Sequence, residues 1–98
     1  MRAGTIIKAE IFKEAKNPAY KLEIDFGELG IKKSSAQITK LYKPEELIGR
    51  QIIAVTNFPA KQIAGFMSEV LVLGLIGDED NIILLQPERQ AKNGMRVA

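Results

Sequence analysis

The sequence predicts an all-β domain: a five-stranded Greek-key barrel with a short helix between its third and fourth strands and a C-terminal extension. Its 98 residues suit a single domain over positions 1–98, without a linker or an internal repeat. Several short apolar segments are separated by turn-forming or polar stretches, as in barrels and sandwiches. Hydrophobic residues make up 46% of the chain and aromatic residues only 6%, so the core must rest on Ile, Leu and Val.

The first two strands are expected at residues 5–12 and 20–26. The earlier segment shows the two-residue period of a strand, with two alternating sets: Ile7, Ala9 and Ile11, and Ile6, Lys8 and Glu10. The later segment places its large apolar residues on one face: Tyr20, Leu22, Ile24 and Phe26. The polar stretch between them ends at Pro18 and is therefore expected to be a loop.

A third strand is expected at residues 31–38, after a turn at 27–30. It contains few apolar residues, so one of its faces must meet solvent or a ligand. A short helix is expected at 44–48, because Pro44 suits the first helical position and Gly49 suits the C-terminal cap.

The remaining strands are expected at residues 51–58, 69–73 and 82–85, with an edge strand at 95–97. An acidic turn at 77–81 would join two of them into a hairpin. Five strands with a helix between the third and fourth are the arrangement of the OB-fold.

The composition excludes several kinds of chemistry. The chain has no Cys and no His, which rules out disulfides, thiol nucleophiles, a Ser–His pair and zinc sites built from these residues. The acidic residues at 78–80 lack the length and spacing of an EF-hand. We therefore expect no enzymatic activity, no metal and no cofactor.

The pattern of apolar residues also bears on location. No run approaches the roughly 20 apolar residues of a membrane helix. The first eight residues lack the apolar stretch of a signal peptide. We therefore expect a cytoplasmic protein without membrane insertion.

Cations and hydrogen-bonding groups are concentrated in the third strand, at Lys32, Lys33, Ser34 and Gln37. Alternate residues of a strand lie about 6.6 Å apart, which is close to the spacing of phosphates in a nucleic acid. The alternative is a solvated edge strand whose charges protect against aggregation.

A second group of candidate binding residues begins at the end of the fourth strand and comprises Asn57, Lys61, Phe66, Met67 and Ser68. Aromatic and thioether groups beside a lysine could stack on bases or hold apolar side chains of a peptide. We expect residues 60–68 to be a loop that displays these groups. The alternative is a loop whose apolar residues fold back onto the core.

Two segments in this order resemble the CsaA family: Ile-Lys-Lys-Ser-Ser-Ala-Gln-Ile-Thr at 31–39, and Ala-Val-Thr-Asn-Phe-Pro-Ala-Lys-Gln-Ile-Ala-Gly-Phe-Met-Ser-Glu at 54–69. The resemblance covers nearly the whole chain. It implies a cytoplasmic OB-fold homodimer, described as a secretion-associated chaperone, whose wider group of relatives binds tRNA without catalysis. Members usually carry a short segment before the first strand, so the dimer here is expected to lean on residues 87–98.

The resemblance places Lys32, Ser34, Gln37, Asn57, Lys61, Met67 and Ser68 beside one groove, and the residue types add Lys33 and Phe66. Phosphates of tRNA would meet Lys32, Lys33 and Lys61. Hydrogen bonds would come from Ser34, Gln37, Asn57 and Ser68, and stacking on bases from Phe66 or Met67. The main alternative is a chaperone that holds unfolded or pre-secretory polypeptides in the same groove through apolar contacts and strand edges.

Overall fold

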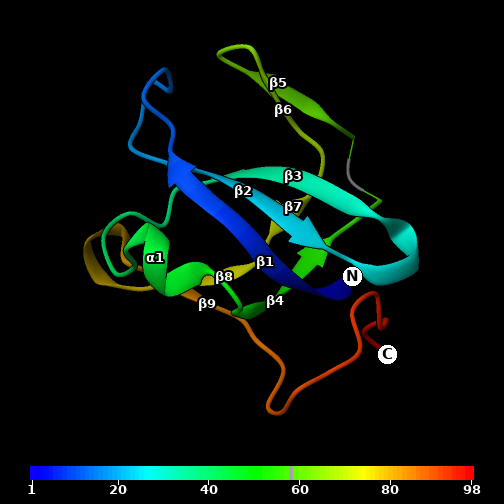
Figure 1. Cartoon of the computed structure of the whole chain (residues 1–98). Coiled ribbons are helices and arrows are strands. Elements are labelled where there is room, and N and C mark those ends of the chain that lie inside the picture. Colours follow the sequence, from blue (N-terminus) through cyan, green and yellow to red (C-terminus); the bar gives the residue numbers. More distant parts are fainter. Residues whose placement is uncertain (58) are drawn as a thin grey trace.

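Five antiparallel strands form a nearly closed barrel in the computed structural model, which describes residues 1–57 and 59–98 (Figure 1). The sheet order is β3-β2-β1-β4-β7, with β1 Arg2–Ile11, β2 Tyr20–Asp25, β3 Ile31–Ala36, β4 Gln51–Val55 and β7 Leu71–Val72. A 3₁₀ turn, η1 Gly27–Leu29, joins β2 to β3, and the helix α1 Pro44–Leu47 lies between β3 and β4. The predicted fold class is confirmed.

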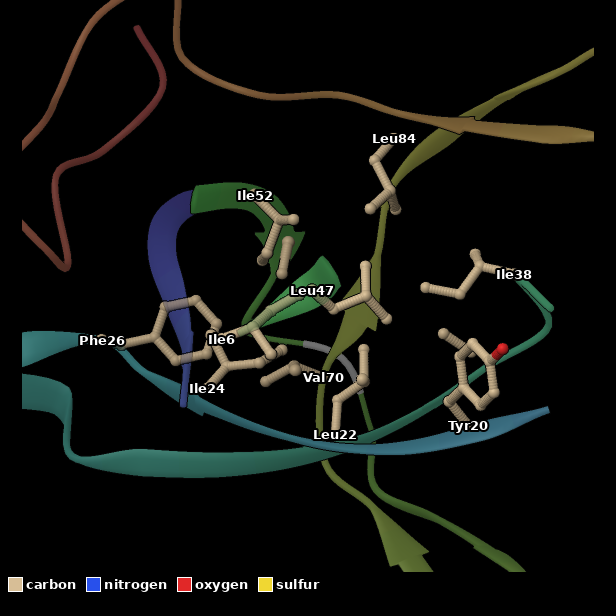
Figure 2. Close-up of a cluster of buried hydrophobic side chains, with 12 residues drawn as sticks. Ile6, Tyr20, Leu22, Ile24, Phe26, Ile38, Leu47, Ile52, Val70 and Leu84 are labelled. Carbon is tan, nitrogen blue, oxygen red and sulfur yellow. The ribbon is translucent and has the colours of Figure 1, made fainter. Parts of the chain in front are cut away.

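The core fills the barrel with aliphatic side chains and a few aromatic ones (Figure 2). As expected, the apolar face of β2 is buried along its whole length. Leu47 of α1 is fully buried in the same cluster. The short helix therefore contributes a core side chain to the barrel.

The strand β1 does not keep a single alternating set of residues buried along its whole length. Ile6 is fully buried, whereas Ile7 is 42% exposed and Ile11 also faces solvent. The pairing of β1 with β2 shifts register between Ile6 and Lys8. Such an irregularity bends a strand and breaks its alternation, so the two-residue period cannot be read straight through it.

Residues 60–68, expected to be a loop, contain a β-hairpin instead. Its strands are β5 Lys61–Ile63 and β6 Phe66–Ser68, which pair only with each other. The turn is made by Ala64 and Gly65, whose φ angles are 46° and 84°. Two successive positive φ values are typical of the tight turns that match the twist of paired strands.

The acidic turn joins two paired strands as expected, but the first of them follows the segment 69–73 instead of lying within it. This hairpin joins β8 Gly74–Ile76 to β9 Ile82–Leu84 through a 3₁₀ turn, η2 Asp78–Asp80. The strands near it are shorter than expected: β4 ends at Val55, and β7 spans two residues. The expectation for residue 58 falls outside the described part of the chain.

The C-terminal extension returns to the start of β1. The N–H of Gly94 donates to the carbonyl of Ala3 at 2.8 Å, and the N–H of Val97 donates to the carbonyl of Met1 at 2.9 Å. The expected edge strand at 95–97 is reduced to an isolated bridge between Arg2 and Arg96. Figure 1 shows both chain ends on the same part of the molecule.

Candidate functional site

Two loops project from one side of the barrel (Figure 1). The first arm is the connection between β1 and β2, residues 12–19. It is closed at its base by the N–H of Phe12, which donates to the carbonyl of Ala19 at 3.0 Å. The second arm is the β5–β6 hairpin, residues 61–68.

A hollow of about 310 Å³ lies between these arms and the end of β3. The first arm contributes Lys16 and Asn17, and the second contributes Lys61 and Gln62. Gln37 and Ser35 line it from the β3 side, together with small or apolar groups: Ala15, Ala19 and Ile63. Within the described chain, no acidic residue lines this hollow, so its charged side chains are all cationic.

The alternation of β3 divides the residues that the sequence grouped together. Ser34 and Ala36 are buried and face the core, and the half-buried Lys32 lies on that same side of the strand. The exposed Lys33 lies on the opposite, outer side. The two lysines therefore do not face one surface together.

Ser34 and Ser68 are used inside the barrel. Ser34 is 1% exposed, and its hydroxyl donates to the carbonyl of Val70 at 2.9 Å. The buried Ser68 accepts the N–H of Ser35 through its Oγ at 3.1 Å. Neither hydroxyl points to the hollow, contrary to the expectation that both would donate hydrogen bonds to a ligand.

Glu69 completes the same seam. Its Oε1 accepts the N–H of Lys33 at 3.0 Å, and its own N–H donates to the carbonyl of Lys33 at 2.8 Å. These contacts satisfy backbone groups of β3, which sits at one end of the sheet order. We define the closing seam as Ser34, Ser68, Glu69 and their partners on β3 and Val70.

The second arm places its candidate residues differently from the expectation. Phe66 is half-buried, with its ring against Phe12. Met67 is 45% exposed, and Asn57 is exposed at the approach to the arm. Of the candidates named from the sequence, the structure brings Gln37 and Lys61 together in the hollow.

The first arm was missed as a source of binding residues. Its sequence was interpreted only as a polar connection, although it carries two lysines, Lys13 and Lys16. The sequence signal that could have identified this arm is the presence of two lysines in the loop between the first two strands. In OB-folds, that loop and the one before the last strand flank the ligand.

The site contains no arrangement of groups for metal binding. Among the described residues, no three acidic side chains converge on a point where a metal could be held. No helix within residues 1–57 and 59–98 is long and apolar enough to cross a membrane.

OB-type barrels bind oligonucleotides and oligosaccharides between such loops. The hollow here has cationic side chains and, among the described residues, no acidic one, which favours an anionic ligand such as a nucleic acid. The family model described as "Putative tRNA binding domain" matches residues 1–96, and the chain belongs to that family.

Similar solved structures confirm the resemblance to CsaA. Chaperone CsaA of Bacillus anthracis is 60% identical with a TM-score of 0.94, and the match covers 99% of this chain and 88% of that chain. CsaA of Picrophilus torridus is 55% identical with a TM-score of 0.93, covering 99% and 89%.

A third similarity is to a much larger protein. Methionine–tRNA ligase of Methanococcoides burtonii is 37% identical over 94 residues, which are 96% of this chain and 14% of the ligase. The chain thus spans about one seventh of the length of the curated relatives that it matches.

Proposed function

We propose that the chain is a non-enzymatic module of the CsaA type that binds tRNA in the hollow between its two arms. The observation that carries this proposal is the chemistry of the hollow. Lys16 and Lys61 supply cations from opposite sides, and the amide of Gln37 lies between them at the end of β3. Lysines neutralise phosphates, and amides can both donate to and accept from the edges of bases.

Exposed groups outside the hollow would extend the contact. Lys33 on the outer side of β3, and Asn57 and Met67 near the second arm, are accessible to a ligand larger than the hollow. Lys32 is half-buried and would reach a phosphate only at the rim of the barrel. This assignment leaves Ser34 and Ser68 to the closing seam.

The first experiment measures binding of purified protein to bulk tRNA at low and at moderate salt. The double variant Lys16→Glu, Lys61→Glu should lose most of the affinity. The control is Lys43→Glu, Lys92→Glu, which has the same net charge but changes lysines near α1 and in the C-terminal extension, away from the arms. Wild-type affinity should fall steeply with salt, because each neutralised phosphate releases counterions.

Either of two results would count against the groove. Equal losses in both double variants would mean that only net charge matters. Unchanged binding in the Lys16, Lys61 variant would place the tRNA elsewhere on the barrel.

A second candidate function is that of an export-related chaperone for unfolded polypeptides. The exposed Met67 on the second arm favours it, since flexible thioethers suit varied apolar partners. The similar structures from Bacillus anthracis and Picrophilus torridus are of chaperones. Wild type should suppress aggregation of an unfolded client, and Met67→Asp should not; equal suppression by both would remove this surface from consideration.

We also propose a cytoplasmic homodimer, formed through the apolar outer face of the β8–β9 hairpin. Leu75 and Ile83 are directly paired on this face and are 55% and 47% exposed. Neither strand carries a charge, so a second copy can bury the same patch against its own. The C-terminal extension, expected to hold the dimer, is bonded through its backbone to Met1 and Ala3 of the same chain.

The mass in solution tests this interface. Light scattering should give twice the chain mass for wild type and the single mass for Ile83→Asp. A monomeric wild type, or a dimeric variant, would contradict the assignment.

A further inference from the structure

A compact cluster of two aromatic rings and a lysine joins the two arms. The rings of Phe12, at the base of the first arm, and Phe66, in β6 of the second arm, lie 5.4 Å apart between centroids at an interplanar angle of 64°. The Nζ of Lys21 lies 4.9 Å from the Phe12 centroid and 5.5 Å from the Phe66 centroid. Edge-to-face rings and an ammonium over a ring are both attractive arrangements.

Lys21 is also held from the first arm. Its Nζ lies 3.9 Å from the Oε1 of Glu14, and its side chain is 28% exposed. The lysine itself belongs to β2, so its position is fixed by the barrel. One cation therefore links the barrel, the first arm and the second arm.

The second arm depends on such contacts for its orientation. Its two strands pair with each other and not with the five-stranded sheet. Its link to β3 lies at its base, where Ser68 accepts the N–H of Ser35. The position of the rest of the hairpin relative to the first arm is consequently set by side-chain packing, of which the Phe12–Phe66 contact is a central part.

The hollow lies between the same two arms, so its width follows their separation. Lys16 stands on one side and Lys61 on the other. A change in the distance between the arms would move both cations relative to Gln37. None of the residues that line the hollow in the described chain is aromatic, so a base would be recognised there by hydrogen bonds.

We propose that Phe12, Lys21 and Phe66 form a clamp that sets the separation of the arms and fits the hollow to a single unpaired nucleotide of RNA. The proposal rests on the function proposed above. Phe66 is a positioning residue that acts through the clamp. Its ring packs against the ring of Phe12, in the place where a base stacked on Phe66 would otherwise lie.

The preference for an unpaired nucleotide follows from size and chemistry. A volume of about 310 Å³ is at the lower end of ligand sites, which suits one nucleotide. The amide groups of Gln37, Gln62 and Asn17 could pair with the Watson–Crick edge of a base, which is free only when that base is unpaired. The deep, narrow major groove of an RNA duplex is also closed to side chains.

A double-mutant cycle tests the clamp. The variants are Phe12→Leu, Phe66→Leu and both together, titrated with a labelled single-stranded RNA decamer and with a duplex of the same sequence. Wild type should bind the single strand about tenfold more tightly than the duplex. Each single variant should lose about tenfold in affinity for the single strand, and the double variant no more than either, because one contact is lost in all three.

Phe12 gives the decisive comparison, because it is only 3% exposed and cannot touch the RNA. If Phe66 stacked on a base directly, Phe66→Leu would weaken binding and Phe12→Leu would not. The slope of affinity against salt should stay unchanged in all three variants, since the cations remain. A smaller slope would mean that phosphate contacts were lost instead.

Two further variants guard against loss of folding. Phe26→Leu makes the same chemical change in the core away from the arms and should lower the unfolding midpoint without changing RNA affinity. Lys21→Met removes the cation while keeping most of the side-chain volume, and it should weaken RNA binding even if Phe12→Leu does not fold.

The outcomes separate this inference from the proposed function. A wild type that binds neither RNA would overturn the function itself. A wild type that binds the single strand, with all clamp variants equally tight, would overturn the clamp alone. Equal wild-type affinity for strand and duplex would overturn the preference for an unpaired nucleotide.

Discussion

Single hydroxyl groups decide how the barrel closes. Ser34 and Ser68 are small enough to fit between β3 and the segment before β7, and polar enough to satisfy backbone groups there. The sequence shows the same residues as hydrogen-bonding groups but not their direction. Their use in the closing seam is a property of the closed barrel, which a local pattern of residues does not contain.

Ser34→Ala should lower the free energy of unfolding by about 1–2 kcal/mol, because the buried carbonyl of Val70 loses its donor. Urea unfolding measures this change. Affinity for tRNA, corrected for the folded fraction, should equal that of wild type. A loss of affinity without a loss of stability would return Ser34 to the binding surface.

Tyr20 gives the barrel a dependence on alkaline pH. Its hydroxyl is buried and donates to the carbonyl of Tyr42 at 2.7 Å. Burial, followed by the negative charges of Glu45 and Glu46, raises the pKa of Tyr20 above its ordinary value of 10.0. The folded state therefore holds the phenolic proton of Tyr20 more tightly than the unfolded state does.

Stability contributed by Tyr20 should therefore be fully present below the ordinary tyrosine pKa and be lost as the pH rises above it. Urea unfolding between about pH 9 and pH 11 should show a steeper decline for wild type than for Tyr20→Phe. The variant should also be less stable at neutral pH, where it lacks the hydrogen bond. Parallel curves would show that other groups cause the alkaline loss.

Among the elements, the second arm shows most clearly what a sequence pattern leaves out. Residues 61–68 contain too few residues per strand for alternation to be visible, and the turn has an alanine where an asparagine or glycine is typical. The hairpin forms because Phe66 and Ser68 have partners on other elements. The buried face of a longer strand such as β2 can be predicted without knowing its partners, because its own alternation of apolar and polar residues shows it.

Ala64 is the weak point of that hairpin, because its φ of 46° is unfavourable for a residue with a β-carbon. Ala64→Gly should relieve this strain and stabilise the hairpin by about 0.5–1 kcal/mol. Amide hydrogen exchange in β5 and β6 should slow accordingly. Gly65→Ala is the matched opposite change: no atom of the described residues lies within 4 Å of the added carbon, so faster exchange would report backbone strain.

For the whole molecule, the order of the elements was predictable and the surface was not. The strand β2, the helix and the acidic turn follow from local patterns of residues 20–26, 44–48 and 77–81, whereas β5, β6 and β8 were not predicted. The hollow requires two loops about 45 residues apart in the sequence to meet, as residues 12–19 and 61–68 do. Of the predicted candidates, only Gln37 and Lys61 line the hollow. A sequence motif groups neighbouring residues of a strand, although successive side chains point to opposite faces.

The docking of the C-terminal extension has a practical consequence. Because the N–H of Val97 bonds to the carbonyl of Met1, the two ends meet at the start of β1, roughly 30 Å from the arms at its other end. A short glycine-rich linker could join the two ends, and new chain ends could be made at the turn between β8 and β9. Such a circular permutant should keep the hollow intact, and in the unpermuted chain a cargo fused at residue 1 or residue 98 should lie away from the hollow.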